Sequence, residues 1–111
     1  DIPANMEMNV YRIVQEALTN IRKHAEAHIV RVLLQCNDGG DYLILVENDG
    51  KGFDEKQIQS EAGKHLGLTI MKERAKHLGG KLKIDSEPDE GTRIELRFNY
   101  TPEQIGNHSS Q

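Results

Sequence analysis

The chain has 111 residues, a formal net charge of −4 and a sequence pI of about 5.7. This length fits one small domain with a single core. The acidic balance, without an obvious basic face, argues against non-specific nucleic-acid binding as the main activity. No apolar run approaches the roughly 20 residues of a membrane span, and no signal peptide opens the chain. We expect an excised fragment, since no initiator methionine begins it.

Cys36 is the only cysteine. A single cysteine excludes an internal disulfide and a cysteine-cluster metal site. Because Cys36 stands in an apolar run, we expect its thiol to be buried.

Apolar residues recur at helical spacing in the first part of the chain. The stripe predicts a helix from about Met6 to near Ala27. Its members are Val10, Ile13, Val14, Ala17, Leu18, Ile21 and Ala25. Alternation then predicts a strand in HIVRVLLQC, and the turn NDGGD leads to a second, more apolar strand, YLILVEN.

Residues 49–65 contain no convincing long element, and we expect a loop with one helical turn at 55–59. Loops of this length in compact domains are usually functional or disordered. A second helix is expected to start near Leu66 and to end at Gly79-Gly80. Its apolar stripe consists of Leu68, Met71, Ala75 and Leu78. The segments KLKIDS and TRIELRF then alternate as the two strands of a hairpin.

The expected order is helix, strand, strand, long loop, helix, strand, strand. Alternating strands give a sheet with one wet face, and the dry face can cover the stripes of both helices. We therefore predict an α+β fold, a two-layer α/β sandwich with the helices packed on one face of a mixed, mostly antiparallel sheet. Residues 1–100 are predicted to form this domain, and residues 101–111 a polar, flexible tail.

One flank of the first helix gathers an acid, an amide, an amine and an imidazole. These residues are Glu16, Asn20, Lys23 and His24. On a wheel of about 100° per residue they lie beside the apolar stripe and not opposite it. They form either a solvated flank with an i, i+4 hydrogen-bonded pair or one wall of a cleft.

The segment ENDGKGF, residues 47–53, follows an apolar strand. Gly50 and Gly52 permit a ligand to approach the backbone closely. Asn48 or Asp49 could accept a hydrogen bond from a ligand amine. The alternative is a simple turn, because Asp-Gly is common in turns.

Two further glycine sites come later in the chain. HLGL, residues 65–68, stands at the expected start of the second helix, where backbone amides bind phosphate well. Gly91-Thr92 precedes the last strand, and its hydroxyl could meet the same ligand. Taken alone, the first site is weak and the second is merely a hairpin.

Together, these segments resemble the catalytic, ATP-binding domain of sensor histidine kinases. That family shares a superfamily with gyrase, a heat-shock chaperone and the mismatch-repair protein MutL. EALTNIRKHA resembles its asparagine box, NDGKG its first glycine box, HLGL the second and Gly91-Thr92 the third. QEALTN, KHA and HLGLTIMKERAKHLGG are most similar to the nitrate-sensor-like subfamily that includes NarX, NarQ, DegS and DesK. The resemblance covers about residues 8–99 and implies the Bergerat ATP-binding fold.

The resemblance implies a site for ATP and Mg²⁺ between the helices. Asn20 would bind Mg²⁺ through its amide oxygen, a ligand that suits a hard cation. Glu16 would be the catalytic residue, polarising the attacking group near the γ-phosphate. Lys23 and His24 would face the phosphates.

The glycine boxes would complete that site. Gly50 and Gly52 would let the loop close over the base, Gly67 would bring helix amides near the phosphates, and Thr92 would support the adenine end. The same boxes add Asn48, Phe53, His65 and Leu68 to the cofactor-binding residues.

The first glycine box departs from the family's pattern at its acid. In DxGxG the glycines stand two and four places after the acid, so Gly50 and Gly52 put that position at Asn48 and not at Asp49. The family's aspartate accepts from the adenine amine. The carbonyl oxygen of Asn48 can still accept, but without a full charge. In the second box, His65 takes the place of the usual first glycine.

The favoured function is transfer of the ATP γ-phosphate to a histidine on a dimerisation domain that is absent from this chain. None of its own histidines lies in a recognisable acceptor helix. The expected partners are that phosphoacceptor domain and a NarL-like response regulator, with no nucleic acid. The fragment is expected to be monomeric and cytoplasmic, and the full-length kinase a homodimer in the cell membrane. Subfamily similarity points to nitrate or nitrite sensing.

Three other functions remain open. They are an anti-sigma-factor serine kinase, a conformational ATPase module of the chaperone or MutL type, and a degenerate interaction domain that no longer binds ATP. A nucleotide-binding measurement separates the last from the others.

Overall fold

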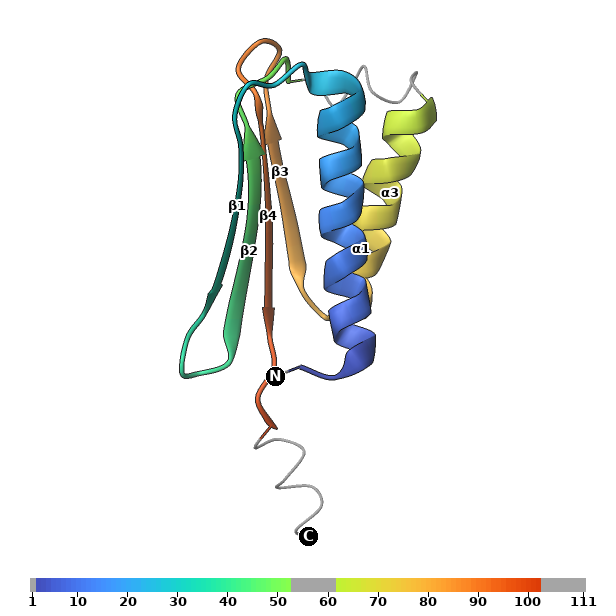
Figure 1. Cartoon of the computed structure of the whole chain (residues 1–111). Coiled ribbons are helices and arrows are strands. Elements are labelled where there is room, and N and C mark those ends of the chain that lie inside the picture. The colour runs from blue at the N-terminus through green and yellow to red at the C-terminus, as the bar shows by residue number, and fades with distance from the viewer. Residues whose placement is uncertain (1, 53–61, 103–111) are drawn as a thin grey trace, which may run out of the picture.

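Figure 1 shows the computed structural model, which describes residues 2–52 and 62–102, without the side chains of His24 and of residues 62–65. The elements follow the expected order. They are α1 (Ala4–Asn20), the π-helical turn η1 (Ile21–Ala25), β1 (Val30–Cys36), β2 (Asp41–Asn48), α3 (Ala62–His77), β3 (Lys81–Ser86) and β4 (Thr92–Asn99). None of the helices within the described ranges is long and apolar enough to cross a membrane.

The strands form one sheet in the order β1-β2-β4-β3, and each neighbouring pair is antiparallel. The helices α1 and α3 pack against each other and lie on one face of this sheet (Figure 1). The prediction of an α+β two-layer sandwich is therefore confirmed. The sheet, expected to be mostly antiparallel, is antiparallel at all of its described pairings.

The core fills the space between the helix layer and the sheet. In β4, Ile94, Leu96 and Phe98 are buried, whereas Arg93 and Arg97 on the opposite face are exposed. This alternation is what a half-buried strand requires. The predicted stripe of the second helix is confirmed, because all its members are buried. The core cluster consists of Ile13, Ala17, Ile44, Val46, Leu68, Met71, Ala75, Leu78, Ile94, Leu96 and Phe98.

Both helices differ from the prediction at their ends. α1 begins at Ala4, before the expected start at Met6, and its regular part stops at Asn20. The chain continues as a π-helical turn to Ala25, and Glu26 then adopts a left-handed conformation with φ of 51°. α3 begins at Ala62 and not near Leu66, so the end of the expected loop is helical. The rest of that loop, residues 53–61 with the turn expected at 55–59, lies outside the described residues.

The expectation of a buried Cys36 thiol is wrong, because this residue is exposed. β1 was correctly predicted as a strand, yet every residue in it is exposed. Val32 is 50% exposed and Leu34 is 66% exposed. The reason is position: β1 lies at the edge of the sheet that the helices leave uncovered, since they contact β2 and β3. Leu18 is likewise 39% exposed, although it belongs to the predicted stripe of α1.

Candidate functional site

Three polar side chains form a row across the sheet at one end. Asn48 of β2 pairs with Thr92 of β4, and Thr92 pairs with Ser86 of β3. The hydroxyl oxygens of Ser86 and Thr92 are 2.7 Å apart. All three residues are half-buried and share the sheet face that carries Val46 and Ile94. This polar row therefore lies next to the apolar core, on the sheet face that the helices pack against.

Ser86 belongs to none of the motifs that predicted the site. It occupies the same alternating face as Leu82 and Ile84, so the pattern of KLKIDS contains the signal that could have found it. Its hydroxyl is also 3.3 Å from the carbonyl oxygen of Gly91. Gly91 itself has φ of 84°, and a Cβ there would lie 2.2 Å from the carbonyl oxygen of Asn48. A residue without a side chain is therefore required where the hairpin meets β2.

Asn48 and Asp49 make different hydrogen bonds. The Oδ1 of Asn48 accepts from the backbone N–H of Gly50 at 2.7 Å. The Oδ1 of Asp49 accepts from the backbone N–H groups of His28 and Ile29, both at 2.9 Å. The bond from Ile29, reinforced by that from His28, lowers the pKa of Asp49 below its ordinary value. Asp49 thus anchors residues 49–52, the glycine loop, to the segment before β1.

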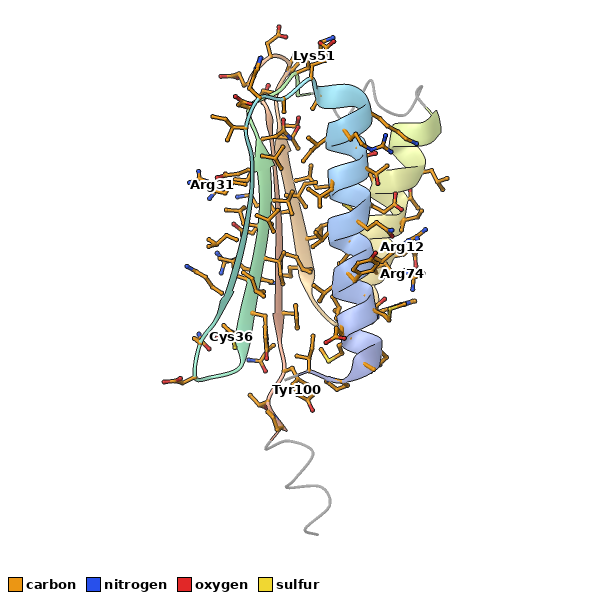
Figure 2. The ribbon with its side chains drawn as sticks, viewed as in Figure 1. Arg12, Arg31, Cys36, Lys51, Arg74 and Tyr100 are labelled. Carbon is orange, nitrogen blue, oxygen red and sulfur yellow. The ribbon has the colours of Figure 1, made fainter. Side chains whose placement is uncertain are left out.

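The glycine loop also contacts the end of the first helix. The backbone N–H of Lys51 donates to the carbonyl oxygen of Ala25 at 2.7 Å. A Cβ at Gly50 would lie 2.2 Å from the same oxygen, so the two backbones can meet only because Gly50 has no side chain. Figure 2 shows Lys51 at this end of the molecule, where its Nζ is 2.8 Å from the Oε2 of Glu26. This pairing lowers the pKa of Glu26 and raises that of Lys51.

Gly67 of α3 lies against the side chain of Asn20 of α1. A Cβ at Gly67 would be 3.0 Å from the Nδ2 and 3.2 Å from the Oδ1 of Asn20. Asn20 is half-buried and Gly67 is buried. Two residues that were predicted to serve the same ligand are therefore neighbours, although they lie far apart in the sequence.

The role expected for the Gly67 amide needs correction. Only the first four N–H groups of a helix lack a partner inside the helix. Because α3 begins at Ala62, Gly67 lies beyond that first turn. Its amide is therefore not one of the free donors of a helix N-terminus. The absence of a side chain at Gly67 instead makes room for the amide of Asn20.

Glu16 lies one turn before Asn20 and is half-buried. Its Oε2 is 3.5 Å from the Nη2 of Arg12, which Figure 2 shows on α1. Lys23 is exposed, and the side chain of His24 lies outside the described residues. Both Lys23 and His24 belong to the π-helical turn, whose wider turns break the spacing of 100° assumed for them. Such turns frequently occur at functional sites.

Of the remaining predicted residues that the structure describes, Leu68 is a core residue and Gly52 packs against a hairpin. Leu68 is 5% exposed and belongs to the core cluster. Phe53 and the side chain of His65 lie outside the described residues. Gly52 has φ of 52°, and a Cβ there would lie 2.0 Å from the carbonyl oxygen of Glu87, so it packs against the β3–β4 hairpin.

A hollow of about 1030 Å³ lies at this end of the sheet, and its lining includes Asn48, Ser86 and Thr92. It also includes Arg31 and Glu47 from the opposite sheet face, and among the described side chains its lining contains none from α1 or α3. The hollow therefore differs from the predicted site between the helices, although both would share the polar row.

Within the described part of the chain, no group of three or more His, Cys, Asp and Glu residues is placed to hold a metal ion. Two oxygen donors of α1, Asn20 beside Gly67 and Glu16 one turn earlier, nevertheless suit one ligand class. The amide oxygen of Asn20 and the carboxylate of Glu16 are oxygen donors, as Mg²⁺ prefers. Mg²⁺ typically uses one or two such protein ligands and completes its shell with waters and phosphates.

Comparison with known families gives a match over most of the chain. Residues 5–102 match the family described as histidine kinase-, DNA gyrase B- and HSP90-like ATPase. Among curated proteins, the chain is 37% identical over 105 residues to the sensor histidine kinase LiaS of Bacillus subtilis, covering 95% of this chain and 28% of LiaS. It is 38% identical over 102 residues to the histidine-protein kinase/phosphatase DegS of Brevibacillus brevis, covering 92% and 25%. It is 42% identical over 99 residues to the sensor protein VraS of Staphylococcus aureus, covering 86% and 26%. The chain thus spans about a quarter of the length of these relatives.

Solved structures show the same fold. The histidine kinase domain of the blue-light activated kinase EL346 of Erythrobacter litoralis superposes with a TM-score of 0.76 at 25% identity, covering 89% of this chain and 46% of that one. The ATP-binding domain of PrrB from Mycobacterium tuberculosis superposes with a TM-score of 0.66 at 26% identity, covering 85% and 68%.

Proposed function

Because the chain belongs to the family of histidine kinase-, DNA gyrase B- and HSP90-like ATPases and its curated relatives are sensor histidine kinases, we propose that it binds ATP with Mg²⁺ and donates the γ-phosphate to a histidine. The acceptor histidine would stand on a dimerisation domain of the same kinase. In such a transfer the protein mainly positions the reactants and stabilises charge.

The observation that carries the proposal is the contact between Gly67 and Asn20. It brings the asparagine box of α1 and the second glycine box of α3 together. The first glycine box joins them from the other side, through the contact of Gly50 and Lys51 with Ala25. Motifs that are dispersed in the sequence thus meet at one end of the molecule, as a shared ligand would require.

The polar residues predicted on α1 and η1 have distinct proposed tasks. The amide oxygen of Asn20 would hold Mg²⁺, which neutralises phosphate charge when it is bound. The carboxylate of Glu16, one turn away, would accept the proton of the attacking imidazole as a general base. Arg12, 3.5 Å from Glu16, would hold that carboxylate in place. The exposed ammonium of Lys23 would attract the phosphates, with His24 beside it.

The base would lie at the polar row of the sheet. Asn48 and Thr92 pair across β2 and β4 and offer hydrogen-bonding groups on the helix side. Ser86, next in the row, supports the Thr92 hydroxyl at 2.7 Å. Gly67 contributes space for Asn20 in this arrangement, and no helix-terminal amide. Leu68 acts only by packing α3 on the core.

The proposal also covers the subfamily, the response regulator, the full-length protein and the sensed signal. The match to DegS supports the nitrate-sensor-like subfamily of the sequence analysis. A response regulator, NarL-like by subfamily resemblance, would receive the phosphate from the acceptor histidine. The full-length protein would be a membrane-bound homodimer with this domain on the cytoplasmic side. Sensing of nitrate or nitrite stays a prediction from subfamily resemblance alone.

A binding and transfer experiment tests the proposal. The chain should bind ATP, with Mg²⁺ raising the affinity, and Asn20→Ala should abolish most of that gain. With a dimerisation domain added in trans, radiolabelled ATP should label the added domain and not the chain itself. Glu16→Gln should keep most ATP binding but slow labelling, since a positioned general base contributes about 10²–10⁴-fold.

Arg22→Gln provides a control on the same helix end, because Arg22 is exposed and has no assigned task. It should bind and transfer like the parent. If Glu16→Gln labels the acceptor as fast as the parent at equal ATP occupancy, the role given to Glu16 is wrong. If the parent binds no nucleotide, the proposed function is wrong.

A further inference from the structure

The side-chain oxygen of Asn48 already accepts a hydrogen bond within the chain, and its NH₂ group is the other polar group that the side chain offers. The Oδ1 accepts from the backbone N–H of Gly50 at 2.7 Å. A backbone N–H needs an oxygen opposite it, so this bond fixes which way the amide points. Turning the amide over would set the Nδ2 hydrogens against that N–H and lose the bond. Within residues 2–52 and 62–102, no group accepts a hydrogen bond from the Nδ2 of Asn48.

A carboxylate at this position would have the opposite character. One of its oxygens would accept from Gly50, and the second would still be an acceptor. In Asn48 that second place is an NH₂ group with two donors. The side chain therefore reverses the hydrogen-bond polarity at one end of the polar row. Thr92, its neighbour in the row, does not restore an acceptor preference, because a hydroxyl can donate or accept.

Purine bases differ in what they would offer to this NH₂ group. Adenine carries an amine, a donor, at position 6, whereas 6-oxopurines carry a carbonyl oxygen, an acceptor. An amine that faces the NH₂ of Asn48 leaves donors on both sides without a partner. Buried polar groups of a site that lack a partner are a strong source of discrimination between ligands.

We propose that Asn48 sets the base specificity of the site, so that 6-oxopurine nucleotides bind at least as well as adenine nucleotides. This inference rests on the proposed function, in which the base lies against Asn48. The geometry that carries it is the 2.7 Å bond from Gly50, which commits the oxygen, together with the register that sets Asn48 beside Thr92 on the helix-covered face.

The test uses ATP and ITP, which differ at position 6 and the adjacent ring nitrogen but carry the same phosphates. Calorimetry with Mg²⁺ gives the ratio Kd(ITP)/Kd(ATP) for the native chain and for Asn48→Asp. Within each protein the ratio cancels effects of total charge and of the phosphate subsite. We expect a ratio of one or less for the native chain. Asn48→Asp should raise it about tenfold, as one exchanged hydrogen bond to a charged group implies.

Gln35→Glu is the matched control. It adds the same charge on the exposed edge strand β1, away from the polar row, and should leave the ratio unchanged. The inference is overturned if the native chain binds ATP more tightly than ITP, or if Asn48→Asp leaves the ratio unchanged. In both cases ATP still binds and the proposed function stands. Binding of neither nucleotide to either protein would overturn the proposed function and this inference together.

Discussion

The substitution Gly67→Ala separates the stability of the helix pair from its ligand chemistry. Gly67 lies inside α3 without a positive φ, so alanine fits the backbone there. Alanine is about 0.8–1.0 kcal/mol more favourable than glycine in a helix interior. Its Cβ, however, would lie 3.0 Å from the Nδ2 of Asn20 and 3.2 Å from the Oδ1. Both distances are shorter than ordinary van der Waals contact, so the amide of Asn20 must move by a few tenths of an ångström.

These two effects oppose each other. Forcing a side chain away from its preferred rotamer costs about 0.5–1.5 kcal/mol, which is close to the helix-propensity gain. We therefore expect the free energy of unfolding of Gly67→Ala to stay within about 1 kcal/mol of the parent. The affinity for ATP in Mg²⁺ should fall by about tenfold, because Asn20 would no longer present its oxygen correctly.

A double-mutant cycle of Gly67→Ala and Asn20→Ala measures the coupling energy between the two residues. In Asn20→Ala the crowding amide is absent, so adding Gly67→Ala should stabilise the chain by the full helix gain of about 0.8–1.0 kcal/mol. The same change in the parent should gain about 0.5–1.5 kcal/mol less than that, which is the coupling energy. Urea denaturation of the four proteins gives the stabilities, and calorimetry gives the ATP affinities. Additivity within about 0.3–0.5 kcal/mol would show that the two residues do not meet.

Three further expectations concern stability and access. Gly50→Ala should lower the free energy of unfolding by about 2–4 kcal/mol, since its Cβ would overlap the carbonyl of Ala25 and displace a hydrogen bond. Gly39→Ala is the control, because the nearest contact of its Cβ would be at 3.4 Å. It should lower the free energy of unfolding, measured by urea denaturation, by less than about 1 kcal/mol. The pKa of Asp49 is lowered from 3.8, so its stabilising bonds are present above that pH and are lost as pH falls through the lower folded value. The difference in urea midpoint between the parent and Asp49→Asn should therefore shrink from pH 7 to about pH 2, and a constant difference would contradict the anchoring role. Cys36 should react completely with a maleimide without denaturant, as mass spectrometry can show, whereas a protected thiol would contradict the exposed edge strand.

The sequence predicted the elements well because their periodicity is strong, but periodicity does not report what covers a face. The alternation of Val32 and Leu34 correctly indicated a strand. It could not show that β1 is an edge strand outside the cover of the helices, because that depends on the sheet order β1-β2-β4-β3 and on where the helices lie. For the same reason the apolar surroundings of Cys36 in the sequence did not bury its thiol.

Helix boundaries were harder to predict, and the errors changed the site. The apolar stripe continues past Asn20 to Ala25, so nothing in the pattern distinguished a π-helical turn from an α-helix. α3 begins at Ala62, whereas the apolar stripe that predicted this helix begins only at Leu68. That start moved Gly67 from a helix end into a helix interior and replaced its expected amide contact by a packing contact.

The motifs predicted the neighbourhood of the site better than the detailed contacts in it. Asn20 and Gly67 were assigned to one ligand from separate boxes, and they are in contact. The alternation of KLKIDS could have placed Ser86 on the core face of its strand, but its contact with Thr92 depends on the register of the hairpin. The partners of Asp49 could not be found from a local motif, because they lie in the backbone before β1, about 20 residues away in the sequence.

Asn48 and Asp49 have different proposed tasks, and each task requires a different side-chain chemistry. Asp49 holds two backbone N–H groups at 2.9 Å, for which a charged acceptor is the stronger partner. Asn48 uses its oxygen for Gly50 and keeps an NH₂ group as its second polar group. The swapped protein Asn48→Asp/Asp49→Asn has the same composition and net charge, so it tests position alone. We expect it to gain the preference for ATP over ITP of Asn48→Asp and to lose the acid-dependent anchoring of the loop. If the swap left both the nucleotide ratio and the pH dependence of the urea midpoint as in the parent, the two side chains would be interchangeable and their separate roles would be refuted.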